Sequence, residues 1–345
     1  MTRIALGRRQ WLAGAGGTVA ALGAGAALPR VARAQSATRP QVVVTHLTAP
    51  AGIGEYEWGL THDRLMARHS TWLRKRAQPT QGYLFNLRTA LEPGAKLDQL
   101  VFNLDPISPW LAQRRVAPFD AGMGTLQPRA LMNVAWPIWM FIAKDPKIRT
   151  AADLAGRRIA LGPKAGTASL MGEELLKSAG VFDKVSIQNL SFADIVKGML
   201  DDTIEVGYAN LWYNPSANRI GPTQGVISLE SSGKPFRYVA FEKAHFERTR
   251  NERGVPIQIV DVPAGTIPLQ TEAMTVMANA DYMAADATFP EDSAYEIVRV
   301  ALQHMDEIAR TGGMAATLTR DFLPYRINNL HPGAARAYRE AKLLK

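Results

Sequence analysis

Apolar residues recur in short runs along the chain, and loops rich in glycine and amphipathic segments separate these runs. Short apolar runs bounded by turn residues are typical of buried strands, whereas apolar residues that recur every three, four or seven positions indicate helices. The pattern predicts strands at residues 41–45, 75–78, 100–103, 158–161, 185–190 and 204–208. It predicts helices within residues 58–72, 86–90, 169–179, 194–200, 291–310 and 333–344. Strands that alternate with helices indicate a mainly parallel sheet with ligands at the carboxyl ends of its strands.

Two segments depart from this alternation. Residues 131–143 are unusually apolar and aromatic, which predicts one long strand that runs from one lobe into the next. Residues 261–280 also have strand character, although Pro263, Gly265 and Pro268 interrupt them. The α/β pattern restarts between the two segments, after a break at Asp145-Pro146. We therefore expect two α/β units with a cleft between them.

A strand, a glycine loop and a helix start lie together in the sequence DLAGRRIALGPKAGTASLMGEELLKSAG. The strand is residues 158–161, the loop is residues 162–168, and Gly180 stands where a left-handed helix cap belongs. Free N–H groups and the helix dipole make such a loop an anion cradle. Thr167 follows Gly166 where a nucleotide-binding loop has Lys, so the cradle suits a carboxylate better than a triphosphate. An ordinary strand-to-helix turn is the alternative.

The N-terminus has the features of an export signal. Arg8 and Arg9 begin the sequence RRQWLAG, residues 11–28 form an uncharged Ala/Gly/Leu run, and Ala32-Arg33-Ala34 offers a cleavage site before Gln35. Paired arginines followed by Trp-Leu resemble a twin-arginine signal. A retained membrane anchor is the alternative, but the run is weakly hydrophobic. We expect residues 1–34 to be a signal peptide and the mature protein to be periplasmic.

Charge and composition exclude several classes of function. The formal net charge is +9, but the signal peptide carries five of the arginines, so the mature protein is less basic than the whole chain. The longest run of basic residues outside the signal is Arg74-Lys75-Arg76, which gives no support for nucleic-acid binding. The chain has no cysteine, which excludes disulfides and thiol chemistry.

Motifs for catalysis are missing from the sequence. Neither the HExxH zinc motif nor the G-x-S-x-G nucleophile turn occurs, and His62 and His69 are seven residues apart, as on one helix face. We therefore expect no cofactor, no metal site and no enzymatic activity. Asn210 and Tyr213 follow the strand predicted at 204–208 and are candidates for the wall of a ligand site, with packing between lobes as the alternative.

Six segments, in order along the chain, resemble the solute-binding proteins of tripartite ATP-independent periplasmic (TRAP) transporters of the TAXI class. Each is short, and the resemblance extends over most of residues 40–345. The segments are TQGYLFNL at 80–87, LDQLVFNLD at 97–105, ADLAGRRIALG at 152–162, DDTIEV at 201–206, EDSAYEIVRVAL at 291–302, and HPGA at 331–334 followed by Tyr338 and Glu340.

The resemblance implies an α/β, two-lobed fold of the periplasmic-binding-protein type (type II), with a hinge and a cleft between the lobes. Residues 40–135 and 276–345 would form lobe one, and residues 136–272 would form lobe two. It also implies a monomeric receptor that binds a small solute, an organic anion or amino acid, and passes it to TRAP membrane permease subunits driven by an ion gradient.

The expected ligand site comprises the glycine loops that follow the strands and two residues that face them. The residues are Gly54, Tyr56, Gln81, Tyr83, Asn86, Gly166, Thr167, Ala168, Ser169, Asn210 and Tyr213. Tyr83 stands where the family usually has Ser, and the first loop, PAGIGEYEW, carries two acids that the family pattern lacks. The identity of the solute therefore does not carry over from the resemblance.

Two other functions are compatible with the same pattern. A binding protein of an ATP-driven importer would share the two-lobed fold, and only the TAXI-like segments argue against it. An exported enzyme could use the same cleft, and a twin-arginine signal is compatible with that role. The missing metal and nucleotide motifs argue against an enzyme.

Overall fold

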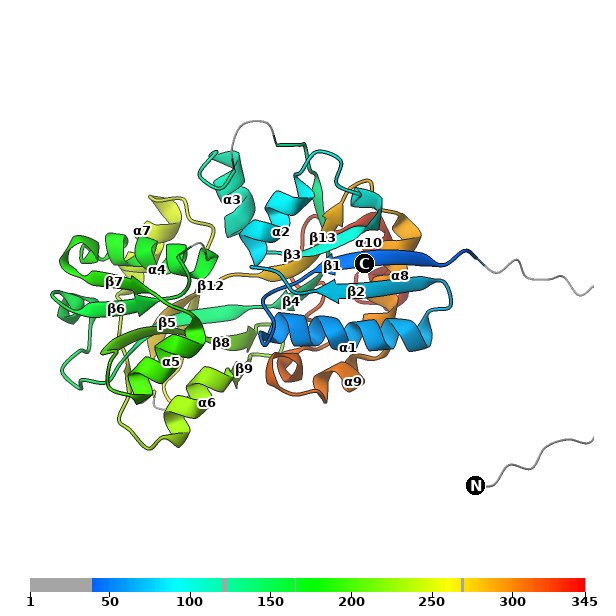
Figure 1. Cartoon of the computed structure of the whole chain (residues 1–345). Helices are drawn as coiled ribbons and strands as arrows, with labels where there is room; N and C mark the ends of the chain where they lie inside the picture. Colours follow the sequence, from blue (N-terminus) through cyan, green and yellow to red (C-terminus); the bar gives the residue numbers. More distant parts are fainter. Residues whose placement is uncertain (1–38, 120–122, 165, 268–269, 345) are drawn as a thin grey trace, which may run out of the picture. The chain divides into compact units, whose positions relative to one another are not determined.

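The computed structural model describes residues 39–119, 123–164, 166–267 and 270–344, and Figure 1 shows its helices and strands. These residues form two β-sheets with helices packed against them. The predicted signal peptide, residues 1–34, lies outside the described residues. Within the described part of the chain, no helix is long and apolar enough to cross a membrane.

The first sheet has five strands in the order β2-β1-β3-β13-β4. β1 pairs with β2 and β3 in parallel, whereas β13 is antiparallel to both of its neighbours. The carboxyl ends of β1, β2 and β3 therefore lie at the same edge of the sheet as the start of β13. The strands are β1 (Val42–Leu47), β2 (Leu73–Gln78), β3 (Leu100–Leu104), β4 (Pro128–Ala135) and β13 (Asp281–Asp286).

The second sheet has eight strands, and six of them follow the order β11-β12-β5-β8-β6-β7. β10 pairs with β5, and β9 pairs with β8. β6 is parallel to β7 and β8, and β5 is antiparallel to β8. The strands are β5 (Pro137–Ala143), β6 (Arg158–Leu161), β7 (Ser186–Asn189), β8 (Val206–Asn214), β9 (Arg219–Pro222), β10 (Arg237–Tyr238), β11 (Gln258–Val262) and β12 (Met274–Ala278).

The helices follow the strands along the chain, as the alternating pattern predicted. α1, α2 and α3 follow β1, β2 and β3, and α4 and α5 follow β6 and β7. The α-helices are α1 (Gly54–His69), α2 (Tyr83–Ala90), α3 (Ile107–Gln113), α4 (Thr167–Ser178), α5 (Phe192–Leu200), α6 (Gln224–Ser231), α7 (Lys243–Asn251), α8 (Glu291–Gln303), α9 (Met305–Ala309) and α10 (Pro332–Glu340). The 3-10 helices are η1 (Leu97–Gln99), η2 (Ala151–Leu154), η3 (Phe182–Lys184) and η4 (Gly313–Thr317).

The chain passes between the two sheets at two short connections. Trp136 separates β4 from β5, so the apolar stretch 131–143 is two strands in different sheets rather than the one long strand that we predicted. Asn279 and Ala280 separate β12 in the second sheet from β13 in the first. The two connections are adjacent, because the Asn279 N–H donates to the carbonyl of Pro137 over 3.3 Å.

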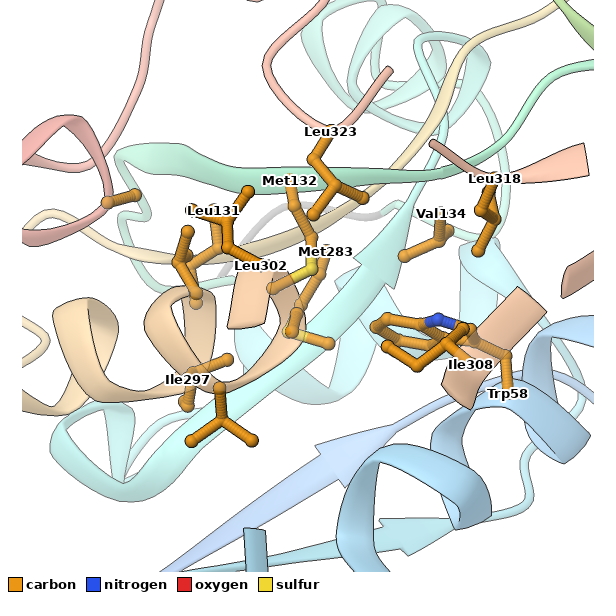
Figure 2. Close-up of a cluster of buried hydrophobic side chains, with 14 of the residues drawn as sticks. Trp58, Leu131, Met132, Val134, Met283, Ile297, Leu302, Ile308, Leu318 and Leu323 are labelled. Carbon is orange, nitrogen blue, oxygen red and sulfur yellow. The ribbon is translucent and has the colours of Figure 1, made fainter. Parts of the chain in front are cut away.

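The C-terminal helices pack on the first sheet. Figure 2 shows Trp58, Leu131, Met283 and Ile297 in one cluster of buried side chains that also includes residues of α9 and η4. The Tyr338 hydroxyl, in α10, donates to the carbonyl of Leu131 in β4 over 2.8 Å. Residues 207 positions apart in sequence thus share one core.

Some boundaries differ from the sequence prediction. α1 ends at His69, so Trp72 lies beyond the helix on which we placed it, and its ring contacts the guanidinium of Arg39. β6 has the predicted bounds, 158–161. β8 extends to Asn214, well past the predicted end at 208. β13 was not recognised as a strand of its own.

Candidate functional site

Polar residues from both sheets meet beside the two connections. Glu55 begins α1, Tyr83 begins α2, Asp105 follows β3, and Asp281 begins β13, all at one edge of the first sheet. From the second sheet, Thr167 begins α4, after β6. Ends of neighbouring strands are the usual place for ligands in open α/β sheets. These residues form the candidate site.

The hydroxyl of Tyr83 joins two of the acids. It lies 2.9 Å from Oε1 of Glu55 and 2.8 Å from Oδ2 of Asp281. A phenol has one proton, so it donates to one carboxylate only. The second contact is a hydrogen bond only if the other carboxyl is protonated and donates to the phenol oxygen. Both contacts are hydrogen bonds when one of the two acids carries a proton.

Asp105 is the third acid of the group and is completely buried. Its Oδ1 accepts hydrogen bonds from the N–H and the hydroxyl of Ser108, over 2.9 and 2.6 Å. Its Oδ2 is buried and has no hydrogen-bond partner. Burial raises the pKa of this carboxyl, and the hydroxyl of Thr167, which lies nearby and comes from the second sheet, offsets a small part of that rise. Asp105 is thus the point where the two sheets face each other.

Burial raises the pKa of all three carboxyls. Burial is the largest cause for Glu55, Asp105 and Asp281, which are 4%, 0% and 1% exposed. The carboxylates of Asp105 and Glu55 raise the pKa of Asp281 further, because like charges repel each other. Burial and the same three carboxyls raise the pKa of the Tyr83 hydroxyl. The four groups therefore form one electrostatic cluster.

The cluster connects to the crossing between the sheets. Nδ2 of Asn279 donates to Oδ1 of Asp281, and the indole N–H of Trp139 donates to Oδ1 of Asn279 over 2.7 Å. Trp139 stacks on Tyr208 with ring centroids 5.2 Å apart. Among the residues that the structure describes, no group of three His, Asp or Glu side chains is arranged to hold a metal ion.

Two predicted site residues already have partners within the protein. The Asn86 amide donates to the carbonyls of Thr48 and Asn103 over 2.7 and 2.9 Å, and its oxygen accepts from Thr80. The Ser169 hydroxyl donates to the carbonyl of Gly162. Asn86 therefore fixes the strand ends of the first sheet, and Ser169 fixes the loop before α4.

The glycine loop before α4 has the geometry of an uncapped helix start. Gly166 occupies the N-cap position and offers no side chain to the first N–H groups of the helix. Thr167 and Ala168 are buried there. A Cβ at position 166 would lie 3.0 Å from the carbonyl oxygen of Pro163, which leaves little space for a side chain.

Asn210 and Tyr213 do not lie where the sequence suggested. Both are inside β8, not in a loop after it, because the strand continues to Asn214 and pairs there with β9. Side chains alternate along a strand, so Asn210 shares a face with Tyr208 and Trp212, and Tyr213 points to the opposite face. Burial raises the pKa of Tyr213, and the nearby Tyr325 raises it further. Asn210 and Tyr213 thus lie on opposite faces of β8, and their role in a ligand site stays a prediction.

The remaining predicted residues surround the start of α1 and α2. A Cβ on Gly54 would lie 2.8 Å from Cβ of Met314, so glycine permits close packing at this position. Tyr56 is partly buried in the first turn of α1, and Gln81 is exposed beside Gly82. Gly82 has a φ of 108°, a conformation that other residues rarely adopt.

Comparison with protein families matches residues 114–341 of the chain, which is more than half of it, to the NMT1-like family. The chain belongs to the NMT1-like family. A search of the curated proteins found no relative of the chain.

Solved structures share the fold of this NMT1-like protein. One, described as a periplasmic transporter, aligns over 88% of this chain and 94% of its own with a TM-score of 0.51 and 14% identity. Another is MatC (Rpa3494) from Rhodopseudomonas palustris with bound malate, which aligns over 88% and 98% with a TM-score of 0.51 and 10% identity. These similarities, together with the two sheets, confirm the predicted two-lobed α/β fold of the periplasmic-binding-protein type.

Sequence reasoning missed the acids that dominate the NMT1-like protein's candidate site. Glu55 was noticed only as one of two acids that depart from the family's first loop. Asp105 was used as a motif residue, and Asp281 was not considered, because β13 was not recognised. The one available signal was the pair Asp105-Pro106, which directly follows β3.

Proposed function

We propose that the chain is the periplasmic solute-binding receptor of a TRAP uptake system of the TAXI class. The receptor binds a small carboxylate-bearing solute and delivers it to the membrane permease subunits. Membership of the NMT1-like family and the two-lobed fold support a solute-binding role rather than catalysis. The TAXI-like segments of the sequence support the TRAP system in particular.

The positions of these segments in the fold add to that support. TQGYLFNL connects β2 to α2 and contains Tyr83, and LDQLVFNLD ends at Asp105. ADLAGRRIALG contains β6 and leads to the loop before α4. Three of the six segments thus contain or lead to residues of the candidate site. The HPGA segment begins α10, where a Cβ on Gly333 would lie 2.0 Å from the carbonyl oxygen of Glu291, so only glycine fits.

The observation that carries the proposal is the convergence of polar groups from both sheets beside the crossing. Tyr83, Asp105 and Asp281 come from the first sheet, and Thr167 comes from the second. A solute that contacts groups from both sheets would bind the closed arrangement more tightly than an open one. Binding of the solute would therefore favour closure. The uncapped first turn of α4 supplies N–H groups for a solute carboxylate.

Closure needs hinges between the lobes, and we assign them to the two connections between the sheets. We place one hinge at Trp136 and the other at Asn279-Ala280, since each is a short link between strands of different sheets. Lobe one would then comprise residues 39–135 and 281–345, and lobe two residues 137–278. We place the second boundary a few residues later than the sequence analysis did, because β12 pairs with β11 and β5.

A thermal-shift screen of organic acids, amino acids and amines tests the binding role, because a solute that binds only the folded protein raises its melting temperature. Calorimetry with each hit follows, on the wild type and on Thr167→Val, which keeps the shape of the side chain and removes the hydroxyl. Thr275→Val in β12 is the matched control, since its hydroxyl contacts Asp261. We expect Thr167→Val alone to weaken binding. Equal affinity in all three proteins would contradict the proposed site.

A further inference from the structure

The three buried carboxyls come from separate parts of the chain and lie around one phenol. Glu55 belongs to α1, Asp281 to β13, and Asp105 to the turn after β3. We propose that this cluster binds a cationic nitrogen group of the solute, an ammonium or a guanidinium. The inference rests on the proposed solute-binding role and specifies the chemistry of its ligand.

Among the residues that the structure describes, no Lys, Arg or His forms an ion pair with Glu55, Asp105 or Asp281. Burial, hydrogen bonds and other acidic groups are the main influences on Glu55, Asp105 and Asp281, and no Lys, Arg or His is among them. Lys75, a buried cation of the first sheet, is already paired with Asp63 over 2.6 Å. A buried carboxylate is costly unless an opposite charge compensates it. A cation from outside the chain fills that role.

Two carboxyl oxygens of the cluster are free to accept hydrogen bonds. Oε2 of Glu55 and Oδ2 of Asp105 are buried and have no hydrogen-bond partner. Each of the two side chains is at least nine-tenths buried. Buried polar atoms without partners are rare in folded proteins and need an explanation. An ammonium group has three donors and a guanidinium has five, so either group can donate to a buried carboxyl oxygen of this kind.

The hydroxyl of Tyr83 links two of the acids. It lies within hydrogen-bond distance of Glu55 and Asp281, and both contacts are hydrogen bonds when one of the two acids carries a proton. That proton neutralises one charge in place of a counter-ion. A bound cation would replace it, so that both acids become carboxylates and Tyr83 donates to one of them.

The same cluster disfavours solutes that are only anionic. A second carboxylate placed beside Asp105 would meet like charges at short range in a buried environment. A solute that carries both charges avoids this conflict if its carboxylate lies at the first turn of α4 and its nitrogen at the acids. Plain dicarboxylates are therefore poor ligands for this receptor.

Matched probes test the inference by calorimetry at neutral pH, where aliphatic amines are protonated. Putrescine, γ-aminobutyrate and succinate share one carbon chain and differ in the charges at its ends; cadaverine, 5-aminovalerate and glutarate form a second such series, and agmatine supplies a guanidinium. We expect binding only from probes with a basic nitrogen. In Asp281→Asn and Glu55→Gln, we expect the Kd of the best probe to rise about tenfold or more, since each loses a charged hydrogen bond.

Asp183→Asn, at an exposed position in η3, is the matched control and should leave the Kd unchanged. Circular dichroism of each variant verifies that it is folded. Binding of the dicarboxylates without the amines overturns the inference and leaves the receptor role standing. The inference also fails if no nitrogen-bearing probe binds, or if both cluster variants bind the best probe as well as the wild type does. The receptor role fails separately, if no compound in the wider thermal-shift screen binds.

Discussion

Replacing Asp281 with Asn removes one ionisable group from the buried cluster and leaves a side chain of nearly the same size. Burial raises the pKa of Asp281 well above its ordinary value, and the carboxylates of Asp105 and Glu55 raise it further. At neutral pH the folded protein must either ionise this buried group or keep it protonated, and both options cost free energy. We therefore expect Asp281→Asn to be more stable than the wild type at neutral pH.

The size of the effect depends on pH in a defined direction. A carboxyl with a raised pKa in the folded state contributes stability below its unfolded pKa of about 3.9, and this contribution is lost as the pH rises through the folded pKa. Between the two values, the free energy of unfolding falls by about 1.4 kcal/mol per pH unit for each carboxyl. Asn does not titrate, so the advantage of the variant grows from near zero in acid to a plateau.

Urea unfolding of both proteins in buffers from about pH 4 to about pH 8 measures this difference directly. Asp183→Asn, at an exposed position, is the control and should have nearly the same free energy of unfolding as the wild type. A variant that is less stable than the wild type at neutral pH would refute the reasoning. A difference in the free energy of unfolding between variant and wild type that shrinks as the pH rises would also refute the reasoning, because a raised pKa of Asp281 in the folded protein makes this difference grow with pH.

Three further substitutions test the packing around the site by urea unfolding. Tyr83→Phe should destabilise the protein by about 1–3 kcal/mol, because it leaves one buried carboxyl oxygen without its donor; an unchanged free energy of unfolding would count against the hydrogen bond. Gly333→Ala should destabilise it by about 1–3 kcal/mol through the clash with Glu291, although Ala is the better helix former; a stabilised variant would disprove the close contact. Lys75→Met should cost about 3–5 kcal/mol, because it strips Asp63 of its buried partner; a cost below about 1 kcal/mol would show that the pair is solvated.

The sequence predicted those elements whose pattern is local. β6 is bounded by Gly156 and Gly162 and was predicted with its exact limits, and the helix after it follows from the spacing of its apolar residues. The long β8 was cut short because Asn210 and Tyr213 are polar enough to suggest a loop. Pairing with β5 and β9 keeps them in the sheet, and sequence spacing does not report such pairing.

The sequence predicted only the part of the site that is formed by loops at the ends of strands. The loops after β1, β2 and β6 were expected to meet, because each follows the carboxyl end of a strand and the two α/β units were expected to face each other across a cleft. The acids were not expected, since Tyr83 and Asp281 are 198 positions apart in sequence. Their contact depends on the return of β13 into the first sheet between β3 and β4, which only the tertiary fold establishes.

A crystal structure of the protein with the solute that gives the largest thermal shift tests the central claim most directly. The account predicts that the solute lies between the two sheets, in contact with Tyr83, Asp281 and Thr167, with α4 directed at its carboxylate. A solute bound elsewhere would contradict the account, for example in the surface groove lined by Lys177, Arg248 and Arg253.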